Sequence, residues 1–203
     1  MSSFREIIRP IVVVALIGIF AGGSLGVMDN YSKEKIELNL NEERKKAVLY
    51  TLNIPYADKS AQEIEAVFQS TISDRKLRGI HYYVYYQEDV IKAYSFPFQG
   101  KGLWGSIAGY ISVDAQAQTL LGLVFTEHSE TPGLGGRMDE AWYKEQFRGI
   151  DIDREEPFVI YGGDGEDSID SITGATLTSD ALLKLINDSI LEIRTIVKED
   201  LNE

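Results

Sequence analysis

The sequence predicts an α+β fold, with a mainly antiparallel β-sheet flanked by helices and preceded by one N-terminal transmembrane helix. Two observations predict it. The middle of the chain alternates apolar and polar residues with the period of a strand, whereas both ends carry apolar residues at helical spacing. An uncharged aliphatic segment also stands near the N-terminus.

The uncharged segment covers residues 11–28, and this length can just span a bilayer. Arg5 and Arg9 precede it, so the positive-inside tendency places the N-terminus in the cytoplasm and the rest of the chain outside. We therefore expect a retained single-pass anchor, in contact with lipid, in the inner (cytoplasmic) membrane. A cleavable signal sequence is the alternative, because Ala21–Gly23 supplies small residues for a peptidase.

Residues 34–52 are rich in Glu, Lys, Asn and Leu, which predicts a mostly exposed helical stalk. Ser60 and Glu63 have capping-box spacing and predict a helix that continues to about Ile72. The domain organisation predicted is an anchor at 1–29, a stalk and the start of the soluble domain at 30–78, and the main domain at 79–203.

The strands follow in the central part of the chain. Alternation predicts strands at residues 81–86, 90–96, 106–113, 119–126 and 158–161, with a short helix at about 139–148 before the last of them. A long helix from Leu177 to about Lys198 follows, because apolar residues recur there every three or four positions. Thr178 or Ser179 is predicted to cap its first turn.

Composition excludes several classes of function. The net charge is −12; Arg5, Arg9 and Glu6 contribute +1, so the rest of the chain carries −13, which argues against a nucleic-acid partner. The chain has no cysteine, which excludes disulfides, zinc–thiolate sites and cysteine-ligated iron–sulfur clusters. His128 lacks metal-ligand spacing, and Asp164–Asp167 lacks the pattern of a calcium loop, so it is predicted to be a solvated turn. We expect no metal and no hydrolase activity.

The segment 170–176, Asp-Ser-Ile-Thr-Gly-Ala-Thr, ends where the long helix begins. A helix N-terminus offers unpaired N–H groups and a partial positive charge, and Gly174 and Ala175 let a ligand approach the main chain. This junction suits an anionic group such as a phosphate. An ordinary capped loop is the alternative.

Two further segments stand out. Residues 128–136 contain Pro132-Gly133 and two more glycines, which predicts a tight turn able to fold over a flat ring or a phosphate. Residues 100–105 match the G-x-G-x-x-G pattern of dinucleotide-binding folds. A strand, and not the required helix, is predicted to follow, so we do not expect a Rossmann site.

Asp-x-x-Thr-Gly-Ala-Thr at 170–176 resembles the attachment motif of the FMN-binding domain found in the C subunit of the sodium-translocating NADH:quinone oxidoreductase (Nqr) and in the G subunit of the Rnf complex. The resemblance implies FMN bound covalently, through its phosphate, to Thr176. A threonine hydroxyl is a weak nucleophile, which implies a separate flavin transferase that uses FAD. The residues that the transferase would read are Asp170, Thr173, Gly174, Ala175 and Thr176.

The loop at 128–135 resembles the His-x-Glu-Thr-Pro-Gly-Leu-Gly loop of the same family, and Gly-Lys-Gly-Leu-Trp-Gly at 100–105 resembles a segment near the flavin ring in the C subunit of Nqr. Besides the attachment residue, the resemblance implies flavin contacts from Leu103, Trp104, Glu130, Thr131, Gly133, Leu134, Gly135, Thr173, Gly174, Ala175 and Leu177.

The function so implied is that of a membrane-anchored electron-transfer subunit of an ion-translocating Nqr-type oxidoreductase, with other membrane subunits as partners and no independent substrate turnover. The Nqr resemblance implies sodium transport, but the residues of this chain leave the transported ion open. The G subunit of an Rnf-type ferredoxin:NAD oxidoreductase and a stand-alone flavoprotein remain open. A flavin-free cell-envelope binding module is the alternative from a different class.

Overall fold

The computed structural model describes residues 2–163, 165 and 168–201, and for residues 2–7, 29–35 and 37 it describes the backbone alone. By its contacts the chain divides into residues 1–43 and a compact unit of residues 44–203. Helix α1, Ser2–Thr51, runs through the first unit and ends in the second. Within it, Ile8–Met28 has a mean hydropathy of 2.4 and is long and apolar enough to cross a bilayer.

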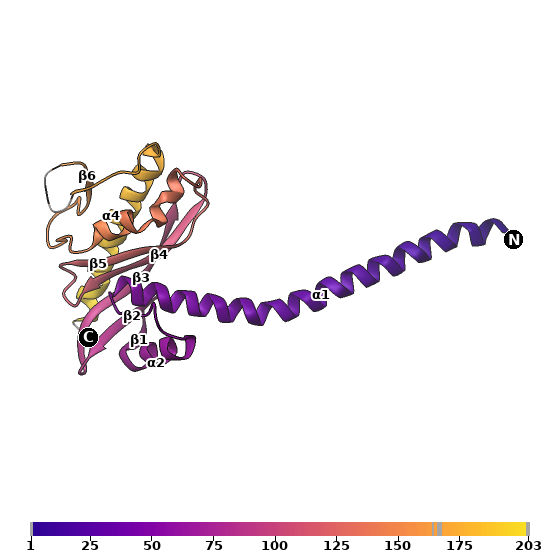
Figure 1. Cartoon of the computed structure of the whole chain (residues 1–203), viewed down its shortest axis with the longest axis horizontal. Helices are drawn as coiled ribbons and strands as arrows, with labels where there is room; N and C mark the ends of the chain where they lie inside the picture. Colours follow the sequence, from indigo (N-terminus) through magenta and orange to yellow (C-terminus); the bar gives the residue numbers. More distant parts are fainter. Residues whose placement is uncertain (1, 164, 166–167, 202–203) are drawn as a thin grey trace. The chain divides into compact units, whose positions relative to one another are not determined.

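The compact unit is built on a five-stranded antiparallel sheet in which neighbours in sequence are neighbours in space, in the order β1-β2-β3-β4-β5 (Figure 1). The strands are β1 (Ile72–Leu77), β2 (Ile80–Gln87), β3 (Val90–Lys101), β4 (Ser106–Asp114) and β5 (Leu120–Glu127). The predicted antiparallel sheet is confirmed, and the predicted central strands correspond to β2–β5.

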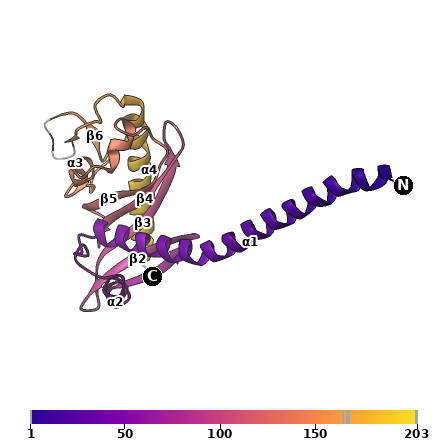
Figure 2. The same cartoon turned by 45° about the vertical axis from the view of Figure 1, so that its right-hand side comes forward.

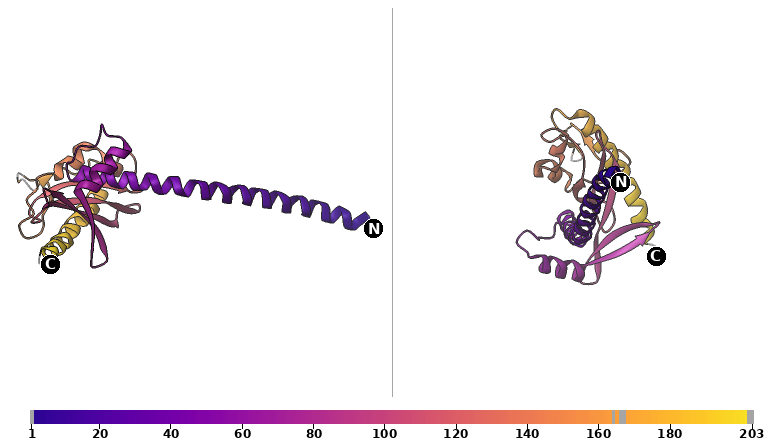
Figure 3. Two further views of the ribbon diagram at one scale, coloured as in Figure 1. Left: turned by 90° about the horizontal axis from the view of Figure 1, so that it is seen from below. Right: turned by 90° about the vertical axis from the view of Figure 1, so that its right-hand side faces the viewer.

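Both faces of the sheet are covered, as its strand alternation requires. Tyr82 and Val84 of β2 point into the main core against helix α4 (Thr176–Asp200), whereas Tyr83 and Tyr85 pack on the other face. There they meet the last turns of α1 and helix α2 (Ala61–Thr71). Figures 2 and 3 show α4 on one side of the sheet and α2 on the other.

The end of α1 is more buried than the predicted stalk. Val48, Leu49 and Leu52 form part of the second core, so the exposed character predicted for residues 34–52 is wrong for these last turns. The capping box of α2 is confirmed: Ser60 Oγ accepts from the N–H of Glu63, and the N–H of Ser60 donates to Glu63 Oε2 (2.8 Å).

Two strands differ from the prediction. Strand β1 was not predicted, because in this edge strand Ile72 alone is buried and the sequence shows no alternation. Strand β3 runs beyond the predicted end at Phe96. It continues through Pro97, which has no N–H, because β2 pairs with β3 only as far as Ser95 and leaves that edge of β3 open.

The segment between β5 and α4 is less regular than predicted. In place of one helix at 139–148 it forms η1 (Gly135–Asp139), α3 (Ala141–Lys144) and η2 (Glu145–Phe147), because the extended backbone of Glu140 interrupts the helix. The predicted strand at 158–161 shrinks to β6 (Ile160–Tyr161), paired in parallel with β7 (Ser168–Ile169).

The shortening of β6 has a visible cause. The N–H groups of Phe158 and Val159 both donate to Asn187 Oδ1 of α4 (2.7 and 3.1 Å), so a side chain takes the place of a neighbouring strand. The predicted helix from Leu177 to about Lys198 is confirmed as α4. The predicted turn at Asp164–Asp167 lies, apart from Gly165, outside the described residues.

Candidate functional site

The three sequence motifs meet at the N-terminal end of α4. The G-x-G-x-x-G segment forms the β3–β4 hairpin, closed by the N–H of Gly102 donating to the carbonyl of Gly105 (2.8 Å). Strand β4 follows it directly, which confirms that no Rossmann helix is present at this place. The loop after β5 lies against this hairpin and against α4, and the loop before α4 lies against the loop after β5, through the contacts described next.

Glu130 joins the motifs. Its carboxylate, in a residue only 4% exposed, accepts hydrogen bonds from the N–H groups of Leu103 (2.8 Å) and Trp104 (3.1 Å) and from the hydroxyl of Thr178 (2.7 Å). A Cβ atom at Gly135 would lie 2.8 Å from Glu130 Oε2 and 2.7 Å from Thr178 Oγ1, so only glycine fits there. Three segments distant in sequence are thus held around one buried carboxyl group.

The loop before α4 turns sharply at its end. Gly174 has φ +81°, a conformation that side chains disfavour, and a Cβ there would lie 3.4 Å from Leu134 Cδ2. The N–H of Ala175 donates to the carbonyl of Ile172 (3.0 Å), and the N–H of Ile172 donates to Ser179 Oγ (3.1 Å). This loop, residues 170–175, is called the attachment loop after the motif that it resembles. It therefore contacts the loop after β5 and the first turn of α4.

The prediction that Thr178 or Ser179 caps α4 is wrong. Thr178 donates its hydroxyl to Glu130, Ser179 Oγ accepts from Ile172 before the helix, and Ala175 occupies the cap position without a side-chain hydrogen bond. Within the described part of the chain, the N–H groups of Thr176 and Leu177 find no acceptor. This helix start has open donors and the positive end of the helix dipole.

The hydroxyl of Thr176 stands at this helix start. Thr176 is exposed, and its hydroxyl forms no hydrogen bond with the residues described in the structure. Around the same junction, apolar side chains from all three motifs face solvent. They are Leu103, Trp104 (68% exposed), Leu134 and Leu177 (65% exposed). We call these four residues the apolar patch.

The remaining predicted contacts lie in the loop after β5. The carbonyl of Thr131 accepts from the N–H groups of Leu134 (3.1 Å) and Gly136 (3.0 Å), which closes the predicted turn. Thr131 and Gly133 are exposed. His128 accepts from the N–H of Glu130 through Nδ1 (3.1 Å) and contacts Asp139 through Nε2 (2.8 Å), so it shapes the loop.

A polar cleft of about 430 Å³ opens beside the attachment loop. Asp170, Ser171 and Thr173 line one side, and Arg137 and Trp142 line the other. Sequence reasoning missed the last two residues. Arg137 and Glu140, three positions apart, have the spacing of an ion pair, but nothing in the sequence places them beside a loop thirty residues later.

Glu140 holds Arg137 and Trp142 in place. Arg137 donates to both of its carboxylate oxygens (3.2 and 3.4 Å), Trp142 Nε1 donates to Oε2, and the guanidinium carbon of Arg137 lies 5.3 Å from the centre of the indole ring. The hydrogen bonds from Arg137 and then from Trp142 lower the pKa of Glu140 below its ordinary value.

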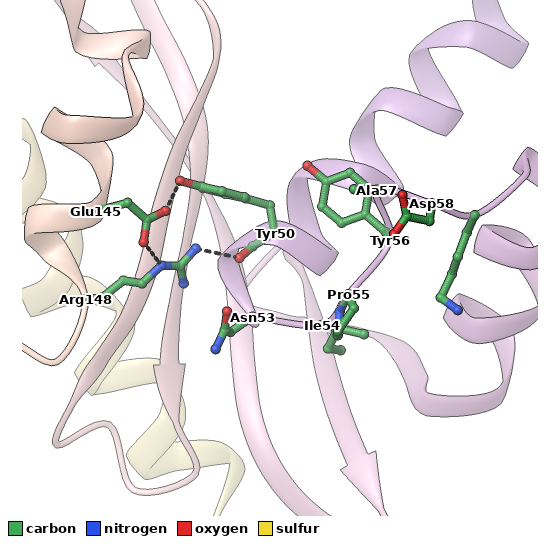
Figure 4. A pocket seen from close by; sticks show the side chains of 10 residues that line it. Tyr50, Asn53, Ile54, Pro55, Tyr56, Ala57, Asp58, Glu145 and Arg148 are labelled. Carbon is green, nitrogen blue, oxygen red and sulfur yellow. Dashed lines mark hydrogen bonds and ion pairs between the residues drawn. The ribbon is translucent and has the colours of Figure 1, made fainter.

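A second cavity, of about 500 Å³, lies between the end of α1 and η2 and contains none of the predicted site residues. Tyr50 donates its hydroxyl to Glu145, and Arg148 joins Glu145 (2.6 Å) to the carbonyl of Tyr50 (2.9 Å) (Figure 4). Burial, with the hydrogen bond to Glu145, raises the pKa of Tyr50 to about 12. These contacts fasten the end of α1 to the domain. Across the described residues, no cluster of three or more His, Asp or Glu could hold a metal ion.

Comparison with known proteins shows which family the residues around this site resemble. Residues 102–191, which include the site segments apart from Gly100 and Lys101, match the FMN-binding domain family. The C subunit of the Na(+)-translocating NADH-quinone reductase of Pasteurella multocida is 38% identical over 92 residues, which covers 42% of this chain and 35% of that protein. The same subunit of Vibrio alginolyticus is 31% identical over 107 residues, covering 49% and 42% respectively.

Solved structures agree on the fold. NqrC of Shewanella oneidensis superposes with a TM-score of 0.62 at 17% identity, over 72% of this chain and 89% of that one. The C subunit of the Na(+)-translocating NADH-quinone reductase of Parabacteroides distasonis superposes with a TM-score of 0.63 at 24% identity, over 76% and 90%. The resemblance seen in the motifs is confirmed, although the chain spans half or less of the length of the curated relatives named above.

Proposed function

Because residues 102–191 match the FMN-binding domain family, we propose that this chain is an electron-transfer subunit of an Nqr-type oxidoreductase, with FMN bound covalently to Thr176. The observation that carries the proposal is the uncapped start of α4. An exposed, unbonded hydroxyl stands there beside N–H groups without acceptors among the described residues. A phosphate ester would supply the missing acceptors.

Attachment needs a second enzyme, because nothing within reach of Thr176 in the described chain is arranged as a base. In the transfer from FAD, the bond between Thr176 Oγ and the FMN phosphorus forms as the bond between the two phosphates breaks. AMP leaves, and the hydroxyl proton passes to a base of the flavin transferase. Thr176 is exposed, which leaves Oγ accessible for this reaction.

The apolar patch provides a surface for the flavin ring. Leu103 and Trp104 on the hairpin, Leu134 on the loop after β5 and Leu177 on α4 are exposed around the attachment point, and a flat aromatic ring would bury them. Glu130 holds the hairpin and the helix in this arrangement. When bound, the flavin supplies transfer of one or two electrons.

The setting we propose for this domain is the outer side of the inner membrane. Residues 1–29 would anchor the chain with the N-terminus in the cytoplasm, residues 30–78 would form the stalk and the start of the soluble part, and residues 79–203 would carry the flavin. Partner membrane subunits would deliver and accept electrons and move sodium. Lipid would contact Ile8–Met28.

The direct test is the intact mass of the full chain, purified after co-expression with a flavin transferase. We expect an increase equal to FMN minus water and a fluorescent band on a denaturing gel. Thr176→Ala should lose both, whereas the matched variant Thr195→Ala should keep both, since Thr195 bonds its own helix backbone on a distant turn of α4. Fluorescence that survives in Thr176→Ala would place the flavin elsewhere. An unmodified wild-type chain would favour a flavin-free binding module.

A further inference from the structure

The attachment loop has two sides of different chemistry. On one side Gly174 meets Leu134, and the apolar patch begins. On the other side Asp170, Ser171 and Thr173 line the polar cleft opposite Arg137 and Trp142. A flavin ring attached at Thr176 has an apolar surface available on the first side, which leaves the second side without a role in holding it.

The polar side chains of this second side are not used by the fold. Asp170 bonds Gln146 Oε1 through its backbone N–H (2.7 Å), but its carboxylate and the hydroxyls of Ser171 and Thr173 form no hydrogen bond with the described residues. Exposed groups of this kind contribute little to stability, so the presence of three in one short loop points to an external partner.

The side chains on the opposite wall of the cleft are joined by hydrogen bonds and are suited to protein contacts. Glu140 fixes Arg137 and Trp142 by three hydrogen bonds, and the guanidinium lies over the indole ring. Tryptophan and arginine are the residue types that most often dominate protein interfaces, and pre-organised side chains lose little entropy on binding. The cleft thus combines an arginine–tryptophan anchor with three side chains that can form hydrogen bonds, Asp170, Ser171 and Thr173.

We propose that the polar cleft between Arg137–Trp142 and the loop Asp170–Thr173 is the surface that the flavin transferase grips while Thr176 enters its active site. The proposal rests on covalent attachment at Thr176. It adds Arg137 and Trp142, with Glu140 as a positioning residue, to the recognition of the loop. It also separates the two sides: the polar cleft serves installation, and the apolar patch serves the installed flavin.

The test compares substitutions in the polar cleft with a substitution in the apolar patch. It uses the full chain in detergent with purified transferase and FAD. Trp142→Ala and Arg137→Glu should each slow the initial rate of flavin attachment by about tenfold or more, the effect of losing one interface anchor. The emission spectrum and reduction potential of the flavin in the loaded fraction should not change. Trp104→Ala, in the apolar patch, should instead alter the emission of the flavin in the loaded fraction.

Controls separate the possible failures. Arg78→Glu, at an exposed arginine paired with Glu199 far along the sequence, should load like the wild type. Glu140→Ala should slow loading, and Glu140→Gln should restore part of the rate, because an amide can still accept from Arg137. Melting temperatures identify any variant that fails to fold. If Trp142→Ala fails to fold, Trp142→Phe replaces it, because phenylalanine keeps an aromatic ring but lacks the N–H donor. Trp142→Phe should load more slowly than the wild type.

Normal loading of both Trp142→Ala and Arg137→Glu would overturn the inference while leaving attachment at Thr176 intact. A changed flavin spectrum in Trp142→Ala would also overturn it, since the cleft would then hold the ring. A failure of the proposed function looks different: wild-type protein itself would remain unloaded, or Thr176→Ala would load.

Discussion

The two ends of helix α4 differ in how their polar side chains are used. At the C-terminal end, the buried carboxylate of Asp200 accepts hydrogen bonds from Tyr82, from Tyr94 (2.8 Å) and from Arg75 (2.8 Å). At the N-terminal end, the hydroxyl of Thr176 has no partner among the described residues and no side chain caps the helix. One end stabilises the fold, whereas the other keeps hydrogen-bonding groups that the described residues do not use.

The same contrast separates Glu130 from its neighbours. Glu130 is buried and bonded to three donors from two other segments, whereas four of the six residues at 170–175 before α4 are exposed. The site therefore consists of a satisfied interior that fixes positions and an unsatisfied surface that can react. Substitutions at the two kinds of position should have effects of different kinds, on stability and on flavin attachment respectively.

The largest effect is expected at the N-terminal end. Thr176→Val keeps the shape of the side chain but removes the hydroxyl, so covalent flavin should be lost completely on a denaturing gel. The free energy of unfolding should change by less than about 0.5 kcal/mol, as for other exposed positions. A large loss of stability in urea titration would contradict the contrast between the two ends of α4.

The next effect is expected at the C-terminal end. Asp200→Ala leaves the hydroxyls of Tyr82 and Tyr94 and the guanidinium of Arg75 without their shared acceptor, which should cost about 2–4 kcal/mol of unfolding free energy. Calorimetry should record a melting temperature lower by roughly 5–15 °C.

The matched control for this change is Asp188→Ala, because Asp188 forms an exposed pair with Lys184 on the same helix. Its effect should stay within about 0.5 kcal/mol. Below the melting temperature, Asp200→Ala should still accept flavin at Thr176 at the normal rate. Slower attachment by the folded variant would mean that the two ends of α4 are coupled.

A smaller loss is expected where the two kinds of position meet. Glu130→Ala removes the acceptor for the N–H groups of Leu103 and Trp104 and for the hydroxyl of Thr178, at a cost of about 1–3 kcal/mol. The hairpin should also loosen, which broadens the emission of the attached flavin. Glu130→Gln keeps one oxygen toward the hairpin and should lose about 1 kcal/mol or less. Equal losses in both variants would show that hydrogen bonding by this oxygen is unimportant.

The smallest expected effect concerns acid pH. Burial raises the pKa of Asp200, but hydrogen bonds from Tyr82, Tyr94 and Arg75 outweigh it, so its pKa in the folded protein is lower than usual. Its stabilisation is therefore complete above the pKa of about 4 in the unfolded chain, and it is lost as the pH falls through the folded value. Asp200→Asn should remove this dependence.

Urea titrations at several pH values measure the difference. Between about pH 4 and pH 2 the stability of the wild type should fall more steeply than that of Asp200→Asn, by up to about 1.4 kcal/mol per pH unit for one proton. Parallel curves for the two proteins would contradict a lowered pKa for Asp200.

Local patterns in the sequence were sufficient for most of the elements. Ser60 and Glu63 lie one helical turn apart, so their capping box could be predicted without knowing the fold. The strands β2–β5 alternate strongly because both faces of the sheet are covered, and α4 carries a continuous apolar stripe. In the edge strand β1 only one residue is buried, so the sequence shows no alternation of apolar and polar residues that would predict a strand.

The motifs themselves were also recognisable from the sequence, because they are short and their spacing is local. Their mutual arrangement was not. Thr178 and Ser179 have the residue types of helix caps, but their side chains form hydrogen bonds with Glu130 and Ile172 instead. The contact between Glu130 and Thr178 joins residues that are forty-eight positions apart in the sequence. The cap was therefore predicted wrongly for a physical reason: a local preference gave way to a buried carboxylate that needed donors.

The sequence by itself determined the type and order of most elements, the apolar segment near the N-terminus and the identity of the motif residues, since these depend on interactions between near neighbours in the chain. The tertiary structure alone decided which polar groups are satisfied. The carboxylate of Asp200 accepts hydrogen bonds from three side chains, whereas no side chain caps the start of α4. The reason is that the sheet packs against α4 so that partner side chains reach one end of the helix and not the other.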